Sequence, residues 1–182
     1  NFIIIRNFGP DEVTNYNIAY KYFNILNMAM MIIVTPFWSA CADAYTKKDF
    51  LWMKNVIEKM EMIWKLSICV LIIMILVSST FYDIWVGDSV KISLSLSVMV
   101  GVYILVQNLC GIYIYMINGT SKIRLQLVVY LVSAFISVPT MYFLCSKYGI
   151  TVMLLVPISV CLIQAFVAKK QLTKIIRGTA SG

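Results

Sequence analysis

Residues 15–40 have the sequence NYNIAYKYFNILNMAMMIIVTPFWSA, and this long apolar segment decides the fold. As a helix rising 1.5 Å per residue it would be about 39 Å long, enough to cross a hydrocarbon core of ~30 Å with some tilt. Asn17, Lys21 and Asn24 interrupt it at helical spacing, and Met28 continues the series. Because residues three and four apart are neighbours on a helix, these side chains share one face. The segment predicts a membrane-spanning helix with one polar face.

The lysine in this polar face is the first candidate for function. An intramembrane lysine costs roughly 2.5 to 3.5 kcal/mol on insertion scales, and such residues usually face a bundle interior or a water-filled cavity. The alternative is that Lys21, which lies near the start of its helix, extends its side chain to the membrane surface. Asn17 and Asn24 have their own alternative, since asparagines in membrane bundles often only hydrogen-bond neighbouring helices. Substrate contact and these structural roles both stay open.

The composition of the whole chain points to a membrane protein. Of its 182 residues 61% are hydrophobic and 13% are charged, and the mean hydropathy is +0.86. Soluble domains carry about 25% charged residues, so we expect an all-α polytopic membrane protein in the lipid bilayer. The net charge of +7 predicts no nucleic-acid partner, because the lysines and arginines stand between apolar runs, where membrane topology accounts for them.

The reactive residues do not form a catalytic pattern. The five cysteines have no CxxC spacing, and the chain has no histidine, so we expect neither a metal site nor a cofactor. A membrane-embedded glycan polymerase or transferase would need clustered carboxylates or histidines near one membrane face. Asp83 and Asp88 are the only candidates, and both suit a turn. The sequence therefore predicts that the protein is not an enzyme.

The rest of the chain divides into further apolar runs separated by turn residues. Gly9 and Pro10 break the backbone, so the residues before them are predicted to be the end of a sixth span. The five full spans are predicted at 13–40, 62–84, 92–117, 122–143 and 150–168. An amphipathic helix at 49–61 is expected along the membrane surface, with a soluble connector as the alternative, and a basic tail follows at 169–182. Residues 1–182 thus form a single transmembrane helix bundle.

The third span carries two adjacent amides, Gln107 and Asn108. They are candidates to line a transport pathway, and hydrogen bonding between helices is the alternative role. The same span has a stripe of small residues, Ser93, Ser97 and Gly101. Small residues let helices approach closely, so this stripe predicts tight packing.

Positive residues gather on one side of the predicted topology. Ten lysines and arginines fall on one side and three on the other. The rich side holds Lys47, Lys48, Lys54, Lys59, Lys122, Arg124, Lys169, Lys170, Lys174 and Arg177, and the poor side holds Arg6, Lys91 and Lys147. By the positive-inside rule the rich side, with the C-terminus, is predicted to be cytoplasmic.

Four stretches of the sequence resemble a known family. They are FGPDEVTNYNIAYKYF at 8–23, TPFWSACADAYTKKDFLWMKNVIEK at 35–59, IWVGD at 84–88 and GTSKIRLQ at 119–126. They are similar to the C-terminal half of bacterial polysaccharide flippases of the O-antigen transporter type. These flippases belong to the MATE-like superfamily of multidrug, oligosaccharidyl-lipid and polysaccharide exporters. The resemblance covers nearly the whole chain.

This resemblance implies a two-lobed bundle in which each lobe has six helices. The chain would be the partial C-terminal lobe, and an N-terminal lobe would be missing from it. The implied activity is to flip undecaprenyl-diphosphate-linked oligosaccharide across the bacterial cytoplasmic (inner) membrane by alternating access, for lipopolysaccharide and other surface polysaccharides. Lys21, Asn17 and Asn24 would line the central cavity. The alternative is a multidrug or ion-coupled antiporter of the same fold, which should carry a buried carboxylate that none of the five spans has at its centre.

Overall fold

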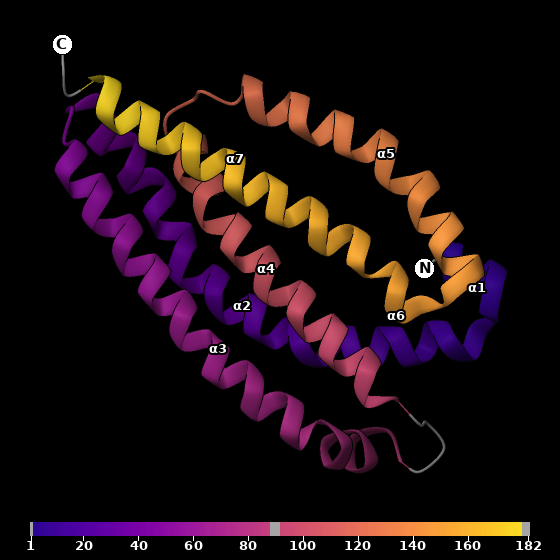
Figure 1. Ribbon diagram of the computed structural model, residues 1–182. Helices are drawn as coiled ribbons and strands as arrows, with labels where there is room; N and C mark the ends of the chain where they lie inside the picture. The colour runs from indigo at the N-terminus through magenta and orange to yellow at the C-terminus, as the bar shows by residue number, and fades with distance from the viewer. Residues whose placement is uncertain (1, 88–91, 180–182) are drawn as a thin grey trace.

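The computed structural model describes residues 2–87 and 92–179, and these residues are helical throughout apart from short connections (Figure 1). The helices are α1 (Phe2–Phe8), α2 (Pro10–Thr46), α3 (Phe50–Val86), α4 (Leu94–Gly119), α5 (Arg124–Tyr148), α6 (Ile150–Met153) and α7 (Leu155–Thr179). Five segments are long and apolar enough to cross a membrane, namely α2, α3, α4, α5 and α6 with α7. By helix length and hydropathy, the chain is a multi-pass membrane protein. Asp88 and Lys91, which the sequence analysis assigned to a turn and to the less basic side, lie outside the described residues.

The expected break before the first full span is confirmed. Gly9 has a φ of 85°, a conformation that suits glycine, and Pro10 starts α2. Proline is favoured there because the first turn of a helix has no partner for its N–H groups. A second proline explains why α6 and α7 are separate helices. Pro157 has no N–H to donate to the carbonyl of Met153, and the helix is interrupted between them.

The structure differs from the expected boundary at Met62. Asp49 caps α3 by accepting a hydrogen bond from the backbone N–H of Trp52 at 3.0 Å, and the helix then continues without a break to Val86. The amphipathic helix predicted at 49–61 is therefore continuous with the span that follows it. Met53, Val56 and Met60 of this segment are buried inside the bundle, whereas Leu51 is exposed. The three buried side chains pack on neighbouring helices instead of on the membrane surface.

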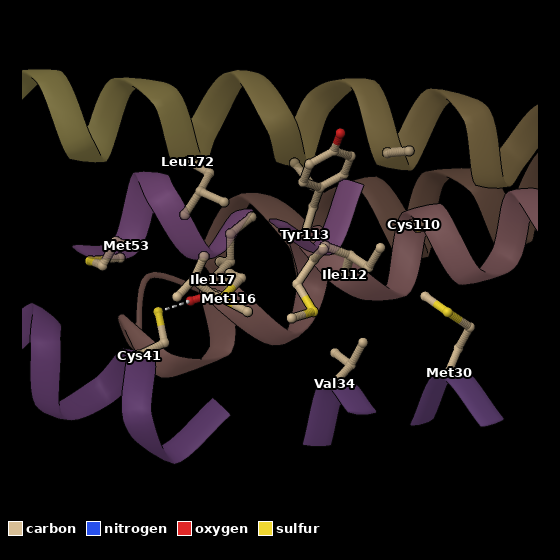
Figure 2. Close-up of a cluster of buried hydrophobic side chains, with 14 of the residues drawn as sticks. Met30, Val34, Cys41, Met53, Cys110, Ile112, Tyr113, Met116, Ile117 and Leu172 are labelled. Carbon is tan, nitrogen blue, oxygen red and sulfur yellow. Dashed lines mark hydrogen bonds between the residues drawn. The ribbon is translucent and has the colours of Figure 1, made fainter. Parts of the chain in front are cut away.

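Helix α4 lies at the centre of the bundle. It packs against α2, α3 and α7, and two clusters of buried apolar side chains form around it. Figure 2 shows the first cluster, in which Met30 and Val34 of α2 lie below α4, and Leu172 of α7 approaches from the other side. The thiol of Cys41 donates to the carbonyl of Met116 at 3.3 Å and joins α2 to α4.

Helix α5 lies at the outer edge of the bundle. It packs against α6, α7 and α1, and Figure 1 shows it on the far side of α7 from α3. The α2–α3 turn, the α4–α5 loop and the C-terminal half of α7 lie together at one end of the bundle (Figure 1). We call this the basic end. Nine of the ten positive residues predicted for the rich side lie in those segments or in the first turns of α3 and α5. The tenth, Lys59, lies two turns into α3. The α1–α2 turn and Gly149 lie at the opposite end.

Candidate functional site

Helices α2 and α4 run parallel, which sets the depth of every polar residue on α2. A Cβ atom added at Gly101 would lie 3.4 Å from the ring of Phe23, and one added at Gly119 would lie 3.1 Å from the Cβ of Cys41. In both contacts the α4 residue has a number 78 higher than the α2 residue beside it. Each α2 residue therefore lies level with the α4 residue whose number is 78 higher. On this register Lys21 is level with the second turn of α4, about 8 Å from its start.

The polar face predicted on α2 points away from the core of the chain. Lys21 is exposed, and Asn17 and Asn24 are half-buried. The core positions of the same helix, among them Tyr22 and Leu26, lie on other sides. Lys21 makes no hydrogen bond or ion pair within residues 2–87 and 92–179. The structure thus supports the outward orientation, while the depth of Lys21 also leaves it within reach of the opposite end of the bundle, as the membrane-surface alternative requires.

Asn24 is hydrogen-bonded to Asn27, a polar residue that was not among the candidates from the sequence. Its Oδ1 accepts a hydrogen bond from Nδ2 of Asn27 at 3.1 Å. The Oδ1 of Asn27 is itself buried and has no hydrogen-bond partner among the described residues. Asn27 lies one turn from Phe23 and one turn from Met31, which both contact α4 at glycine positions. It therefore lies at the α2–α4 interface, close to the middle of α4.

The two adjacent amides of α4 do not lie together. Gln107 lines a hollow of about 450 Å³ between α4, α5 and α7, and its Oε1 is buried without a partner. Asn108 is 1% exposed and does not belong to the lining of this hollow. Neither polar atom of its amide has a partner in the described part of the chain. Adjacent residues of a helix point about 100° apart, and Gln107 and Asn108 accordingly do not line the same hollow.

Helix α7 adds a fourth amide at the same depth. Gln164 is 8% exposed, lines the hollow, and its Oε1 accepts from the thiol of Cys110 at 3.7 Å. We call Asn27, Gln107, Asn108 and Gln164 the amide layer. In a bilayer an unsatisfied polar group costs several kcal/mol, so a layer with unpaired oxygens is an expensive feature for a span to keep. A signal was present in the sequence, because Gln164 stands alone in an apolar run.

The hollow beside the amide layer is mostly apolar, and its polar groups are uncharged. No Lys, Arg, Asp or Glu lines it. Its polar lining comes from Tyr103, Gln107, Tyr115, Tyr130, Ser133, Ser137 and Gln164. Such neutral donors and acceptors can hydrogen-bond hydroxyl or amide groups of a ligand. Residues 2–87 and 92–179 contain no cluster of three or more Cys, Asp or Glu that could hold a metal ion.

A separate ionic cluster joins three helices near the basic end. Lys169 of α7 approaches Glu61 of α3 at 2.9 Å, and the hydroxyl of Tyr113 of α4 donates to the same carboxylate at 2.7 Å. The Lys169 ammonium also lies 5.6 Å from the centre of the Tyr113 ring. The ammonium and the hydroxyl both bind the Glu61 carboxylate. The cluster is therefore a structural connection between α3, α4 and α7.

Comparison with protein-family models, curated proteins and solved structures gives no match to this chain. The resemblance to polysaccharide flippases therefore stays an expectation from the sequence. The interpretation of the site rests on its residues and their geometry.

Proposed function

We propose that this chain is one lobe of a transporter that flips a lipid-linked oligosaccharide across the bacterial cytoplasmic membrane by alternating access. One observation carries the proposal: the polar face of α2 points away from the core of its own bundle. An ammonium and two amides in an otherwise apolar span need water or a second protein surface opposite them. A partner lobe facing α2 would supply both at a central cavity.

The polar groups suit the two chemical parts of such a substrate. The Lys21 ammonium is free of ion pairs in the described residues and would attract the diphosphate, because charge attraction strengthens where water is scarce. The amides of Asn17 and Asn24 would bond sugar hydroxyls. The neutral hollow beside Gln107 offers further partners of the same kind.

The orientation of the protein in the membrane follows from the charges at its two ends. The basic end carries most of the lysines and arginines, and the positive-inside rule assigns such an end to the cytoplasm. Lys21 then lies toward the outer leaflet. In this arrangement its role is to hold the diphosphate after the sugar has crossed, before release into the outer leaflet.

The test is the variant Lys21→Ala in the full-length protein, with surface polysaccharide as the readout. We expect accumulation of surface polysaccharide to be abolished while the amount of protein in the membrane, measured by immunoblot, is unchanged. Lys65→Ala is the matched control, because Lys65 is also exposed and makes no ion pair in the described residues. Normal polysaccharide in Lys21→Ala would refute the proposed role. If drug resistance fell instead, the antiporter of the same fold would replace the flippase.

A further inference from the structure

The second half of α7 leaves the hydrocarbon core of the membrane. The apolar run at 150–168 is about 28 Å long as a helix, close to the ~30 Å thickness of the core. The helix nevertheless continues to Thr179. From Lys169 onward its side chains therefore lie at the depth of the lipid headgroups.

Two open hollows of about 710 and 650 Å³ lie on the surface of this part of α7, and Lys170 and Lys174 line both. The first is lined by α7 alone, and the second lies between α7, the α4–α5 loop and the start of α5. We call them together the α7 groove. Arg177 lines the first hollow, and Lys122 from the α4–α5 loop lines the second. A hydrogen bond of 2.6 Å from Nε2 of Gln171 to the carbonyl of Lys122 holds that loop beside α7.

The charge in the α7 groove is not balanced. No Asp or Glu lines either hollow. Lys122, Lys174 and Arg177 make no ion pair with any residue in the described ranges. The lysine that has a carboxylate partner is Lys169, whose ammonium turns to Glu61 on α3. A concentration of positive charge at headgroup depth is thus left for an anion from outside the chain.

The groove also has an apolar side. Phe166 is 60% exposed and Leu125 is 46% exposed, and both lie in the lining. The Lys170 ammonium lies 4.2 Å from the centre of the Phe166 ring, so charge and apolar surface are in direct contact. A free phosphate ion would use only the charges. An amphiphile with a phosphate next to acyl chains would use both surfaces.

We propose that the α7 groove binds an anionic phospholipid of the bilayer, with its phosphate between Lys122, Lys170 and Lys174 and its acyl chains along Phe166 and Leu125. Basic pockets between spanning helices recognise anionic headgroups in this way. The proposal rests on the spans and the groove alone. It does not depend on the transport function or on Lys21.

The test measures lipid binding to the purified full-length protein in detergent by native mass spectrometry. Phosphatidylglycerol should bind more tightly than phosphatidylcholine. A lysine near an anionic lipid surface contributes about five-fold in affinity, so the triple variant Lys122→Gln, Lys170→Gln and Lys174→Gln should weaken phosphatidylglycerol binding on the order of a hundred-fold. If this triple does not fold, Lys174→Gln alone should still give the five-fold loss.

The matched control removes three lysines of the same end that lie outside the groove: Lys47, Lys48 and Lys59. It should retain binding within about five-fold, the effect of one lysine. An equal loss in the two triples would overturn the proposal, since it would mean that only net charge matters. The last experiment adds soluble glycerol phosphate as a competitor of the lipid. Competition by glycerol phosphate at the affinity of the lipid would identify an anion site without a lipid preference, and it would also refute the proposal.

Discussion

Helices α4 and α5 have similar lengths and opposite positions in the bundle. They contain 26 and 25 residues. Over an 18-residue window, α5 is slightly more apolar, with a mean hydropathy of 2.0 against 1.7 in α4. Half of that window is buried in α4 and none of it in α5. The two helices differ in their glycines. Helix α4 carries Gly101, Gly111 and Gly119 where neighbours approach, whereas α5 has no glycine. Hydropathy identifies a span, and glycines let neighbouring helices come close to the central one.

The largest effect is expected when a side chain is added where the backbone of another helix comes closest to a glycine of α4. A Cβ at Gly119 would lie 3.0 Å from the carbonyl oxygen of Trp38 and 3.1 Å from the backbone N of Ala42. Because backbone atoms cannot move aside, Gly119→Leu should destabilise the protein by about 3 kcal/mol. Val132→Leu on the exposed side of α5 is the control, because Val132 is 52% exposed, and it should change stability by less than about 0.5 kcal/mol. The check is reversible unfolding of the purified protein in mixed micelles.

A smaller effect is expected when the same side chain is shortened in both helices. Ile104 of α4 is fully buried and Ile136 of α5 is 63% exposed. Ile104→Ala leaves a cavity and should lose about 2 kcal/mol, mainly through lost packing contacts. Ile136→Ala should lose less than about 0.5 kcal/mol. Equal losses in the two unfolding curves would mean that a partner covers α5 as fully as the bundle covers α4.

These contrasts also explain how much of the fold the sequence could predict. Each apolar run became a helix in the structure, because a chain in lipid must satisfy its backbone groups within the span. The boundary predicted at Met62 is absent from the structure, because α3 continues through it. The change from an amphipathic to an apolar pattern reports only a change in what surrounds the helix. It does not report where a helix ends. The cap at Asp49 depends on local sequence alone, because its side chain accepts from the backbone N–H of Trp52, three residues further on.

The candidate site was less predictable than the fold. That Asn17, Lys21 and Asn24 share one face followed from helical spacing alone, but the direction in which this face points did not. The amide layer did not, because Asn27 and Gln164 meet α4 through tertiary packing that a single sequence does not reveal. The different surroundings of Gln107 and Asn108 could have been inferred from their adjacency.

The smallest stability effect is expected at the ionic cluster that joins α4 to α3 and α7. Glu61→Gln keeps the shape of the side chain and removes the charge that binds Lys169 at 2.9 Å. The loss should be about 1 kcal/mol, since more than half of the lysine side chain is solvent-exposed and the pair is partly screened. A double-mutant cycle with Lys169→Met measures the coupling. Zero coupling would show that Tyr113 alone holds the carboxylate.

The central claim is that the polar face of α2 borders water or a partner lobe, and cysteine accessibility tests it most directly. In a full-length variant with the native cysteines replaced by alanine, Met28→Cys continues the polar face one turn deeper than Asn24, and Ala29→Cys is its neighbour about 100° away. Both positions are exposed in the structure, so depth and exposure are matched. We expect a water-soluble maleimide to label Met28→Cys in intact membranes much faster than Ala29→Cys. Equal, slow labelling at both positions would mean that lipid covers this face, and it would contradict the account.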